Sequence, residues 1–304
     1  MDELISQKVK FTFSGHDTFH CRHLWLKKGF DFIKKGEKFS NDDAVVKLGV
    51  GRNMVSAINF WMKAFGIIDK NNDLTEFAEY IFNDNHGKDR YLEDEGTIWL
   101  LHYHLVKNNI ASIYSLIFND FRREKIEFTK DHFIAYVLRK AEEYNITQIN
   151  KNTISADFEV LIKMYLRTDI HSKDREDTFS GILTEINILH EEKGRFGDVK
   201  SLNSYSIIND EKNIIPEEVI LFVILDADIF DKSINLSEIE YGRNQPGSIF
   251  GINRTGLVSK LENITLNNKF KTFGITFNDH AGIKELQFKT KPNKFEILDQ
   301  YYVN

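Results

Sequence analysis

Residues 42–69 constrain the fold most, because they follow the pattern of a helix-turn-helix. A first short helix should end at Gly49, and Gly49 and Gly51 allow a tight turn, since glycine adopts positive φ without strain. A second helix should cover residues 52–65, and a small hairpin over 67–75 would complete the winged form of the motif. The inward-facing stripe of the second helix is Val55, Ile58, Met62 and Phe65.

The other side of this second helix is polar. Helices of this kind meet the major groove of DNA, and arginine and asparagine read guanine and adenine edges through paired hydrogen bonds. The candidate contacts on the helix are Arg52, Asn53, Ser56, Asn59 and Lys63. Further phosphate contacts are expected from Lys27, Lys28, Lys47 and Lys70. The alternative is a structural or protein-docking unit, favoured by Phe60 and Trp61, because two large aromatic residues leave less room for a polar face.

The charge distribution fits local rather than general nucleic-acid binding. The chain of 304 residues has 40 lysines and arginines against 46 acidic residues, a net charge of −6. Residues 1–70 contain 12 basic and 8 acidic residues, which leaves 28 against 38 for the remainder. The helix-turn-helix therefore lies in the basic part of an acidic protein, which is compatible with modest, salt-sensitive DNA affinity.

The chain as a whole should be mainly α-helical with small β-hairpins. We expect a winged helix-turn-helix domain over 1–88, a helical domain over 89–210 and a small α+β domain over 211–304. In the helical domain, three helices followed by a hairpin would form a second winged-helix unit. Other elements expected from the pattern are helices over 18–34, 130–143, 153–167, 178–186, 217–230 and 257–264, a turn into a strand over 245–250, strands over 273–277 and 283–288, and a terminal helix within 295–302.

Several side chains could form other kinds of site. His16, Asp17 and His20 are the densest set of potential metal ligands, and His16 and His20 have an i, i+4 spacing, but no further ligand set accompanies them. One histidine of the pair His102 and His104 should be a hydrogen-bonded core residue. The acids Asp226, Asp228 and Asp231 should be a solvated helix end. There is no phosphate-binding glycine loop or nucleophile elbow, so neither an enzyme nor a cofactor is predicted.

The cellular location is predicted from what the sequence lacks. Cys21 is the single cysteine, so no disulfide framework can form within the chain and a reducing compartment is expected. No apolar run approaches the length of about 18 residues that a membrane span needs, and the first residues do not have the pattern of a signal peptide. We therefore expect a cytoplasmic protein without membrane contact, whose oligomeric state is open.

The sequence resembles a prokaryotic family known only as a domain of unknown function. The most specific match is the stretch Phe13-Ser14-Gly15-His16-Asp17-Thr18-Phe19. The other matching stretches are Trp25–Gly29 with Arg22, Leu48–Met54, Trp61 with Ala64, Tyr91–Asp94, Trp99–His104, Pro246–Phe250 and Ala281-Gly282. Members of this family are encountered beside genes for DNA phosphorothioation and other phage-defence systems. The resemblance implies an accessory of DNA modification or defence, and it transfers no catalytic residues.

Two functions follow as expectations. The first is a DNA-binding accessory protein of a modification or defence system, with double-stranded DNA as its partner. The second is an adaptor whose winged helices dock a modification or defence enzyme without reading bases. A metal-dependent nuclease or hydrolase using the histidines between His16 and His23 is a third, weaker alternative.

Overall fold

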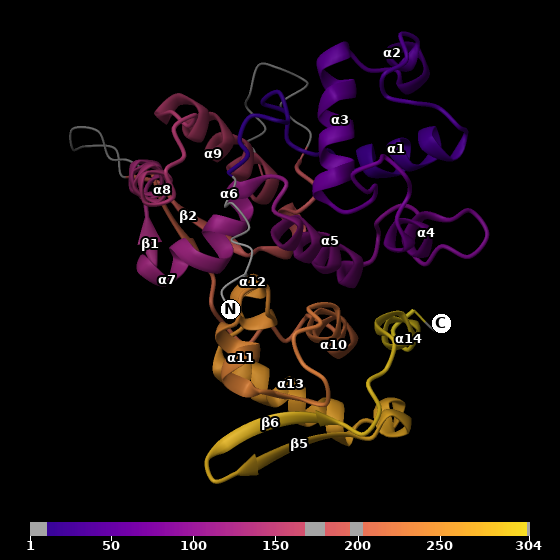
Figure 1. Ribbon diagram of the computed structural model, residues 1–304, viewed down its shortest axis with the longest axis vertical. Coiled ribbons are helices and arrows are strands. Elements are labelled where there is room, and N and C mark those ends of the chain that lie inside the picture. Colours follow the sequence, from indigo (N-terminus) through magenta and orange to yellow (C-terminus); the bar gives the residue numbers. More distant parts are fainter. Residues whose placement is uncertain (1–10, 168–179, 195–202, 303–304) are drawn as a thin grey trace, which may run out of the picture.

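The structure is a computed structural model that describes residues 11–167, 180–194 and 203–302. Within these ranges the protein is mainly helical, with two three-stranded antiparallel sheets in the strand orders β1-β3-β2 and β4-β6-β5. The first four helices lie at one end of the molecule and the C-terminal segments at the other, with α5 between them (Figure 1). The predicted class, mainly α with small antiparallel β elements, is confirmed.

The helix-turn-helix is formed by α2 (Ala44–Leu48) and α3 (Arg52–Ala64), which pack on α1 (Trp25–Lys34). Gly49 ends α2 in the left-handed conformation with φ 63°, as the glycine turn predicts. The expected hairpin after α3 is reduced to one bridge between Ile68 and Leu74, and α4 (Glu76–Phe82) follows.

The predicted start of the first helix is wrong. Asp17 and Thr18 have φ values of 48° and 66°, which an α-helix cannot accommodate, and the regular helix begins at Trp25 instead. Residues 13–20 form an irregular loop, called the loop 13–20 below.

The middle of the chain contains two of the predicted helices, α8 (Lys130–Glu143), whose bounds match the prediction, and α9 (Lys151–Tyr165), which lies two residues before the predicted range. The helix expected over 178–186 is reduced, in its described part, to the 3-10 turn η3 (Thr184–Ile186). The remaining elements of this region are α5 (Glu95–Asn108), α6 (Ser112–Ser115), the π-helix η1 (Leu116–Phe121), α7 (Arg122–Glu124), β1 (Glu127–Phe128), β2 (Leu189–Glu192) and β3 (Ser204–Ile207).

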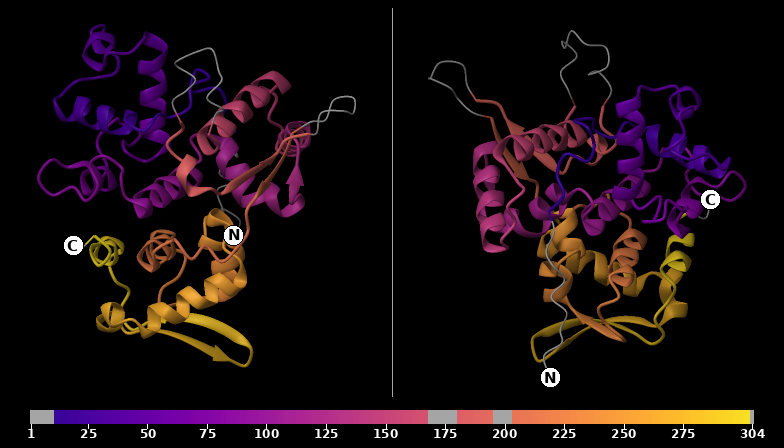
Figure 2. Two further views of the ribbon diagram at one scale, coloured as in Figure 1. Left: turned by 180° about the vertical axis from the view of Figure 1, so that it is seen from behind. Right: turned by 45° about the horizontal axis from the view of Figure 1, so that its top comes forward.

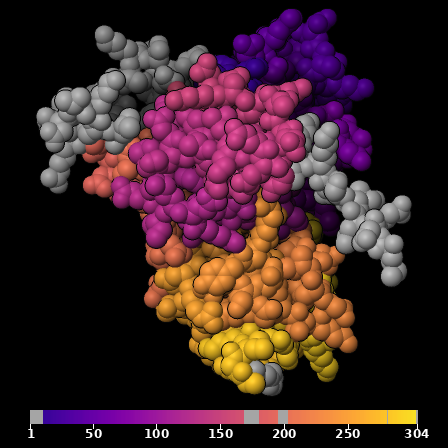
Figure 3. All heavy atoms as spheres, turned by 60° about the vertical axis from the view of Figure 1, so that its left-hand side comes forward, coloured from indigo at the N-terminus to yellow at the C-terminus, as the bar shows by residue number. Residues whose placement is uncertain are grey.

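The C-terminal region packs directly beneath the middle region, as the space-filling view shows (Figure 3). The turn into a strand predicted over 245–250 is wrong. Pro246 occupies the first turn of a short helix, where its missing N–H costs nothing, and Gly251 ends that helix in the left-handed conformation. The elements here are α10 (Glu217–Asp226), β4 (Ser233–Asn235), α11 (Leu236–Tyr241), α12 (Pro246–Phe250), α13 (Arg254–Leu266), η4 (Asn268–Phe273), β5 (Ile275–His280), β6 (Ile283–Phe288) and α14 (Lys294–Asp299).

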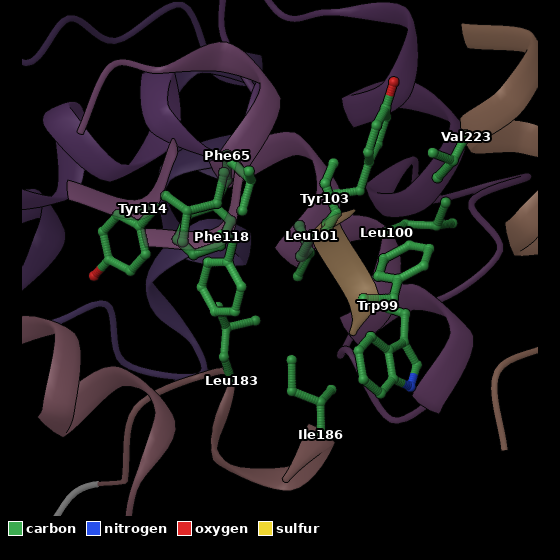
Figure 4. Packing of buried hydrophobic residues seen from close by; sticks show 14 of the residues in the cluster. Phe65, Trp99, Leu100, Leu101, Tyr103, Tyr114, Phe118, Leu183, Ile186 and Val223 are labelled. Atoms are coloured by element: carbon green, nitrogen blue, oxygen red, sulfur yellow. The ribbon is translucent and has the colours of Figure 1, made fainter. Parts of the chain in front are cut away.

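One core connects these regions. α5 is buried on nearly all sides, and its residues Trp99, Leu100 and Tyr103 contribute to a cluster that also takes Tyr114 and Leu183 (Figure 4). The same cluster runs from the first helices to the last helix. In the described part of the chain, no helix combines the length and apolar character that a membrane span requires.

Candidate nucleic-acid interface

The solvent face of α3 begins at its N-terminus. Arg52, Asn53 and Ser56 are exposed, and none of them forms a hydrogen bond or ion pair through its side chain with another described residue. The glycine turn before Arg52 leaves this end of the helix uncovered, since neither Gly49 nor Gly51 has a neighbouring atom within 4 Å of an added Cβ. The first turns of α3 thus present three polar side chains that are free to meet a ligand.

The polar face becomes less exposed toward the C-terminal end of α3. Asn59 and Lys63 continue the stripe, because residues 52, 56, 59 and 63 share one side of a helix, but both are half-buried. The Oδ1 atom of Asn59 is buried without a partner in the described structure. Lys63 lies instead at the edge of a hollow that it shares with Lys70.

The lysines that were expected to contact phosphates differ in their exposure and in their ion pairs. Lys27 is buried and pairs with Asp31 at 2.5 Å and Asp84 at 3.3 Å, so its assignment as a phosphate contact is wrong. It fails because the side chain lies on the inner side of α1, where an ammonium needs a carboxylate partner. Lys28 and Lys70 are exposed, and Lys28 donates to the Leu48 carbonyl at 3.3 Å.

Lys47 is exposed but already paired. Its ammonium lies 2.6 Å from Glu37 and 2.7 Å from Asp43. The hydrogen bonds to Asp43 and Glu37 raise the pKa of Lys47. A DNA phosphate would have to compete with two carboxylates for this charge, which makes Lys47 a weaker candidate than Lys28.

The loop 13–20 packs on α3 through aromatic contacts. The buried ring of His16 stacks on Trp61 with centroids 5.3 Å apart, and the edge of Phe60 approaches the same imidazole at 5.6 Å. The Trp61 indole N–H donates to the Phe19 carbonyl at 2.9 Å. A Cβ on Gly15 would lie 2.3 Å from Cε2 of Phe60, so this close approach requires glycine at the position. Phe60 is therefore part of the loop contact rather than an open docking surface.

The same loop also contacts α9. Both carboxylate oxygens of Asp157 accept from the Ser14 backbone N–H, at 2.9 and 3.2 Å. His16 Nε2 lies 3.4 Å from Asp157 Oδ2, and both residues are almost fully buried. In Figures 1 and 2 the indigo loop accordingly lies between α3 and α9. The family-typical stretch thus fixes two helices relative to each other, and Asp157 is the partner that sequence reasoning missed.

The residues expected as weak metal ligands do not form a site. His16 points into the protein toward Trp61, whereas Asp17 is exposed and His20 is buried. In residues 11–167, 180–194 and 203–302, no three His, Cys, Asp or Glu side chains are grouped so that they could hold a metal ion. The i, i+4 spacing of His16 and His20 does not bring their side chains to one face, because the loop backbone is not helical.

Two other groups of titratable residues have defined roles. His102 is the buried core histidine that was expected, and its ring nitrogens lie 2.8 Å from the Tyr165 hydroxyl and 3.0 Å from the Ile249 carbonyl oxygen. Asp226 was expected to be solvated, but its side chain is only 6% exposed. Its carboxylate accepts from Tyr103 Oη at 2.6 Å and pairs with Lys107 and Lys294. Burial alone would raise the pKa of Asp226, but His104 and the two ammonium groups hold it well below its usual range.

Comparisons with known proteins place this geometry in a family. A crystal structure of SspB with bound magnesium ion aligns with a TM-score of 0.80 and 23% identity, over 99% of this chain and 90% of that one. A second SspB crystal structure aligns with a TM-score of 0.79 and 24% identity, over 96% and 88% of the two chains. At this identity the likeness establishes a shared fold. The comparison with curated proteins found no match. The family DUF4007, described as a protein of unknown function, matches residues 13–302, and the chain belongs to this family.

Proposed function

We propose that the protein is a DNA-binding accessory of a bacterial DNA-modification or phage-defence system, and that α3 contacts double-stranded DNA. The observation that carries this proposal is the group of exposed, unpaired side chains Arg52, Asn53 and Ser56 in the first turns of α3. In a helix-turn-helix these positions meet base edges in the major groove. The modification or defence context rests on the resemblance of the sequence to a family encountered beside such genes.

Phosphate contacts would flank this group. Lys28 on α1 and Lys70 on the turn after α3 are exposed, and Lys63 lies further along the same helix. Lys27 takes no part, because its ammonium is buried between two carboxylates. The interface is small, so most of its affinity would come from phosphates and would fall steeply with salt.

A second contact with the duplex would come from α9. The order β1, α8, α9, β2, β3, with β3 between β1 and β2, supports a second winged-helix unit, in which α9 would take the place of the second helix. Lys151 and Asn152 are exposed in the first turn of α9. We propose that the loop 13–20, which holds both α3 and α9, fixes the angle between these two DNA-contacting helices.

A fluorescence-anisotropy titration with duplex DNA at two salt concentrations tests the proposal. The double variant Arg52→Ala/Asn53→Ala should bind the duplex more weakly than the wild type at both salt concentrations, because it removes two side chains proposed to contact base edges. The control is Asn268→Ala/Lys271→Ala on η4, which removes one asparagine and one basic side chain from exposed positions in the C-terminal region. Equal affinities of wild type and the Arg52/Asn53 variant at both salt concentrations would overturn the proposal.

The second candidate function is an adaptor that docks an enzyme of the same system. It is favoured by Val46, which is 82% exposed on α2 beside the helix-turn-helix. A partner recovered in stoichiometric amount from nuclease-treated lysate should be lost with Val46→Glu and retained with Arg52→Ala. The reverse pattern would assign the surface to nucleic acid.

A further inference from the structure

A hollow of about 440 Å³ lies where the C-terminal end of α3 meets α4, α5, α10 and α14. In Figure 1, α10 and α14 lie directly below α4 and α5, so the hollow joins the N-terminal and C-terminal parts of the protein. Its lining includes lysines from four separate segments and aromatic residues from four helices. No part of the Arg52, Asn53 and Ser56 group lines it.

Four lysines border the hollow, namely Lys63 on α3, Lys70 on the following turn, Lys107 on α5 and Lys294 on α14. Lys63 and Lys70 form no hydrogen bond or ion pair with any residue that the structure describes. Three carboxylates, those of Asp69, Glu76 and Asp226, lie among the same lining residues, so the lysines are in excess. In a protein with a net charge of −6 this is a local positive site.

The carboxylate of Asp226 accepts hydrogen bonds from two of these lysines, Lys107 and Lys294, but it does not use all of their N–H groups. Lys294 donates one hydrogen bond to Asp226 Oδ1 at 2.5 Å. Lys107 donates to the Asp226 carbonyl at 3.0 Å and to its carboxylate. Each ammonium has three N–H groups. Two donors of Lys294 and one of Lys107 therefore remain free of described partners, and Asp226 holds both ammoniums in place.

Asp69 does not compete for these donors. Its Oδ1 accepts from the backbone N–H groups of Asn71 at 2.8 Å and Asp73 at 2.9 Å, and its Oδ2 accepts from the Asn71 amide at 3.2 Å. The backbone hydrogen bond from Asp73 leads the contributions that lower the pKa of Asp69. The carboxylate thus shapes the turn that carries Lys70 and leaves the lysine itself available.

The remaining wall of the hollow is aromatic, and its rings are inclined to one another. Phe77 and His104 lie with ring centroids 4.1 Å apart, and Phe222 and Phe295 complete the wall. The Lys294 ammonium lies 5.8 Å from the Phe222 ring and 5.3 Å from the Phe295 ring. His104 Nε2 is buried without a partner in the described chain. A planar heterocycle could stack on these rings and offer that nitrogen a hydrogen bond.

We propose that this hollow binds a mononucleotide, with its phosphate among the four lysines and its base against the aromatic wall. The combination of several ammonium donors with stacking rings is the chemistry that recognises nucleotides. A volume of about 440 Å³ is within the range of pockets for small ligands. The site goes beyond the proposed function, because it needs neither a duplex nor the exposed turns of α3.

Isothermal titration calorimetry of the full chain with AMP, and separately with inorganic phosphate, tests the site. AMP should bind more tightly than phosphate, because only AMP uses the aromatic wall. Lys294→Gln and Lys70→Gln should each weaken AMP binding about tenfold, which corresponds to about 1.4 kcal/mol. Lys70→Gln leaves the Asp226 contacts intact, so its effect cannot come from loss of folding. The matched control Lys125→Gln removes an exposed lysine outside the hollow and should leave binding unchanged.

A third titration separates a free nucleotide from the end of a DNA strand. If a 5′-phosphorylated single strand binds with the same dependence on Lys70 and Lys294, and AMP does not, the nucleotide belongs to a strand end. Absence of binding by both AMP and the strand, or binding that ignores both lysine variants, would overturn the proposal. Arg52→Ala/Asn53→Ala should leave AMP binding intact, so failure of duplex binding and failure of this site are distinguishable.

Discussion

The imidazole of His16 stacks on the indole of Trp61, with ring centroids 5.3 Å apart and ring planes 3° from parallel. The contact joins the family-typical stretch of the sequence to the middle of α3. On its other side, His16 Nε2 lies 3.4 Å from the carboxylate of Asp157 on α9. One buried side chain therefore lies between the two helices that we propose to contact DNA.

His16→Ala should lower the free energy of unfolding by about 3 kcal/mol, because it leaves a cavity beside Trp61 that the rigid loop cannot fill. Both ring nitrogens lack hydrogen-bond partners in the described structure, so the loss should come from packing. Urea unfolding at pH 7 measures the change. The exposed His86→Ala is the control and should change stability by less than about 0.5 kcal/mol. Similar stabilities of the two variants would contradict the bridging role of His16.

The neighbouring lysines Lys27 and Lys28 should respond in opposite ways. Lys27→Ala removes a buried stem and its pairs with Asp31 and Asp84, so it should reduce stability by about 1–2 kcal/mol and leave duplex affinity unchanged. Lys28→Ala should leave stability nearly unchanged and weaken duplex binding, with a salt dependence shallower by about one unit. Unfolding and anisotropy titrations of the same preparations measure both effects. If the folded Lys27→Ala variant bound the duplex more weakly than the wild type, Lys27 would be a phosphate contact after all.

Local pattern predicted the helices that carry the candidate interface. The stripe of Val55, Ile58 and Met62 placed α3 within one residue of its observed end, and Gly49 marked the turn before it. α8 was also predicted closely, because Thr129 caps its first turn, whereas α9 was predicted from Thr153 and begins two residues earlier, after its cap Asn150. These signals act over a few residues, so they can be read from the sequence.

Contacts between distant residues could not be read in this way. Ser14 and Asp157 are 143 positions apart, and nothing in either local stretch announces their hydrogen bond. The helix expected from residue 18 failed because Thr18 adopts a left-handed conformation that its side chain does not suggest. Asp226 looked like a solvated helix end because its partners Lys107 and Lys294 come from other helices. Long-range packing decides all three.

Gly66 should tolerate substitution less well than Gly36. Both have positive φ, 69° and 79°, so alanine would strain either backbone by about 1 kcal/mol. At Gly66 the added Cβ would also lie 2.8 Å from Nδ2 of Asn108, whereas at Gly36 it would meet nothing within 4 Å. Asn108 Nδ2 donates to the Ala64 carbonyl at 3.2 Å at the end of α3, and this hydrogen bond should weaken. Unfolding curves should therefore show a larger loss for Gly66→Ala, and equal losses would show that backbone strain alone matters.

Stability should decrease as the pH falls from 7 to 5, with His102 as one cause. Burial lowers the pKa of His102 to about 4 from the ordinary 6.5, although the hydrogen bond with the Ile249 carbonyl opposes the shift. As the pH falls through 6.5 the unfolded chain takes up a proton that the folded protein accepts only near pH 4. The free energy of unfolding therefore decreases between these values, at up to about 1.4 kcal/mol per pH unit.

His102→Gln isolates this contribution, because glutamine does not titrate. The wild type should lose about 2 kcal/mol more than the variant between pH 7 and pH 5, as urea unfolding at the two pH values would measure. The absolute stability of the variant is lower, because the hydrogen bonds of His102 with Tyr165 and Ile249 are disturbed, so the comparison uses only the difference between pH values. Parallel pH profiles of wild type and variant would show that His102 takes up its proton equally in the folded and unfolded chain, which full burial between Tyr165 and Ile249 does not allow.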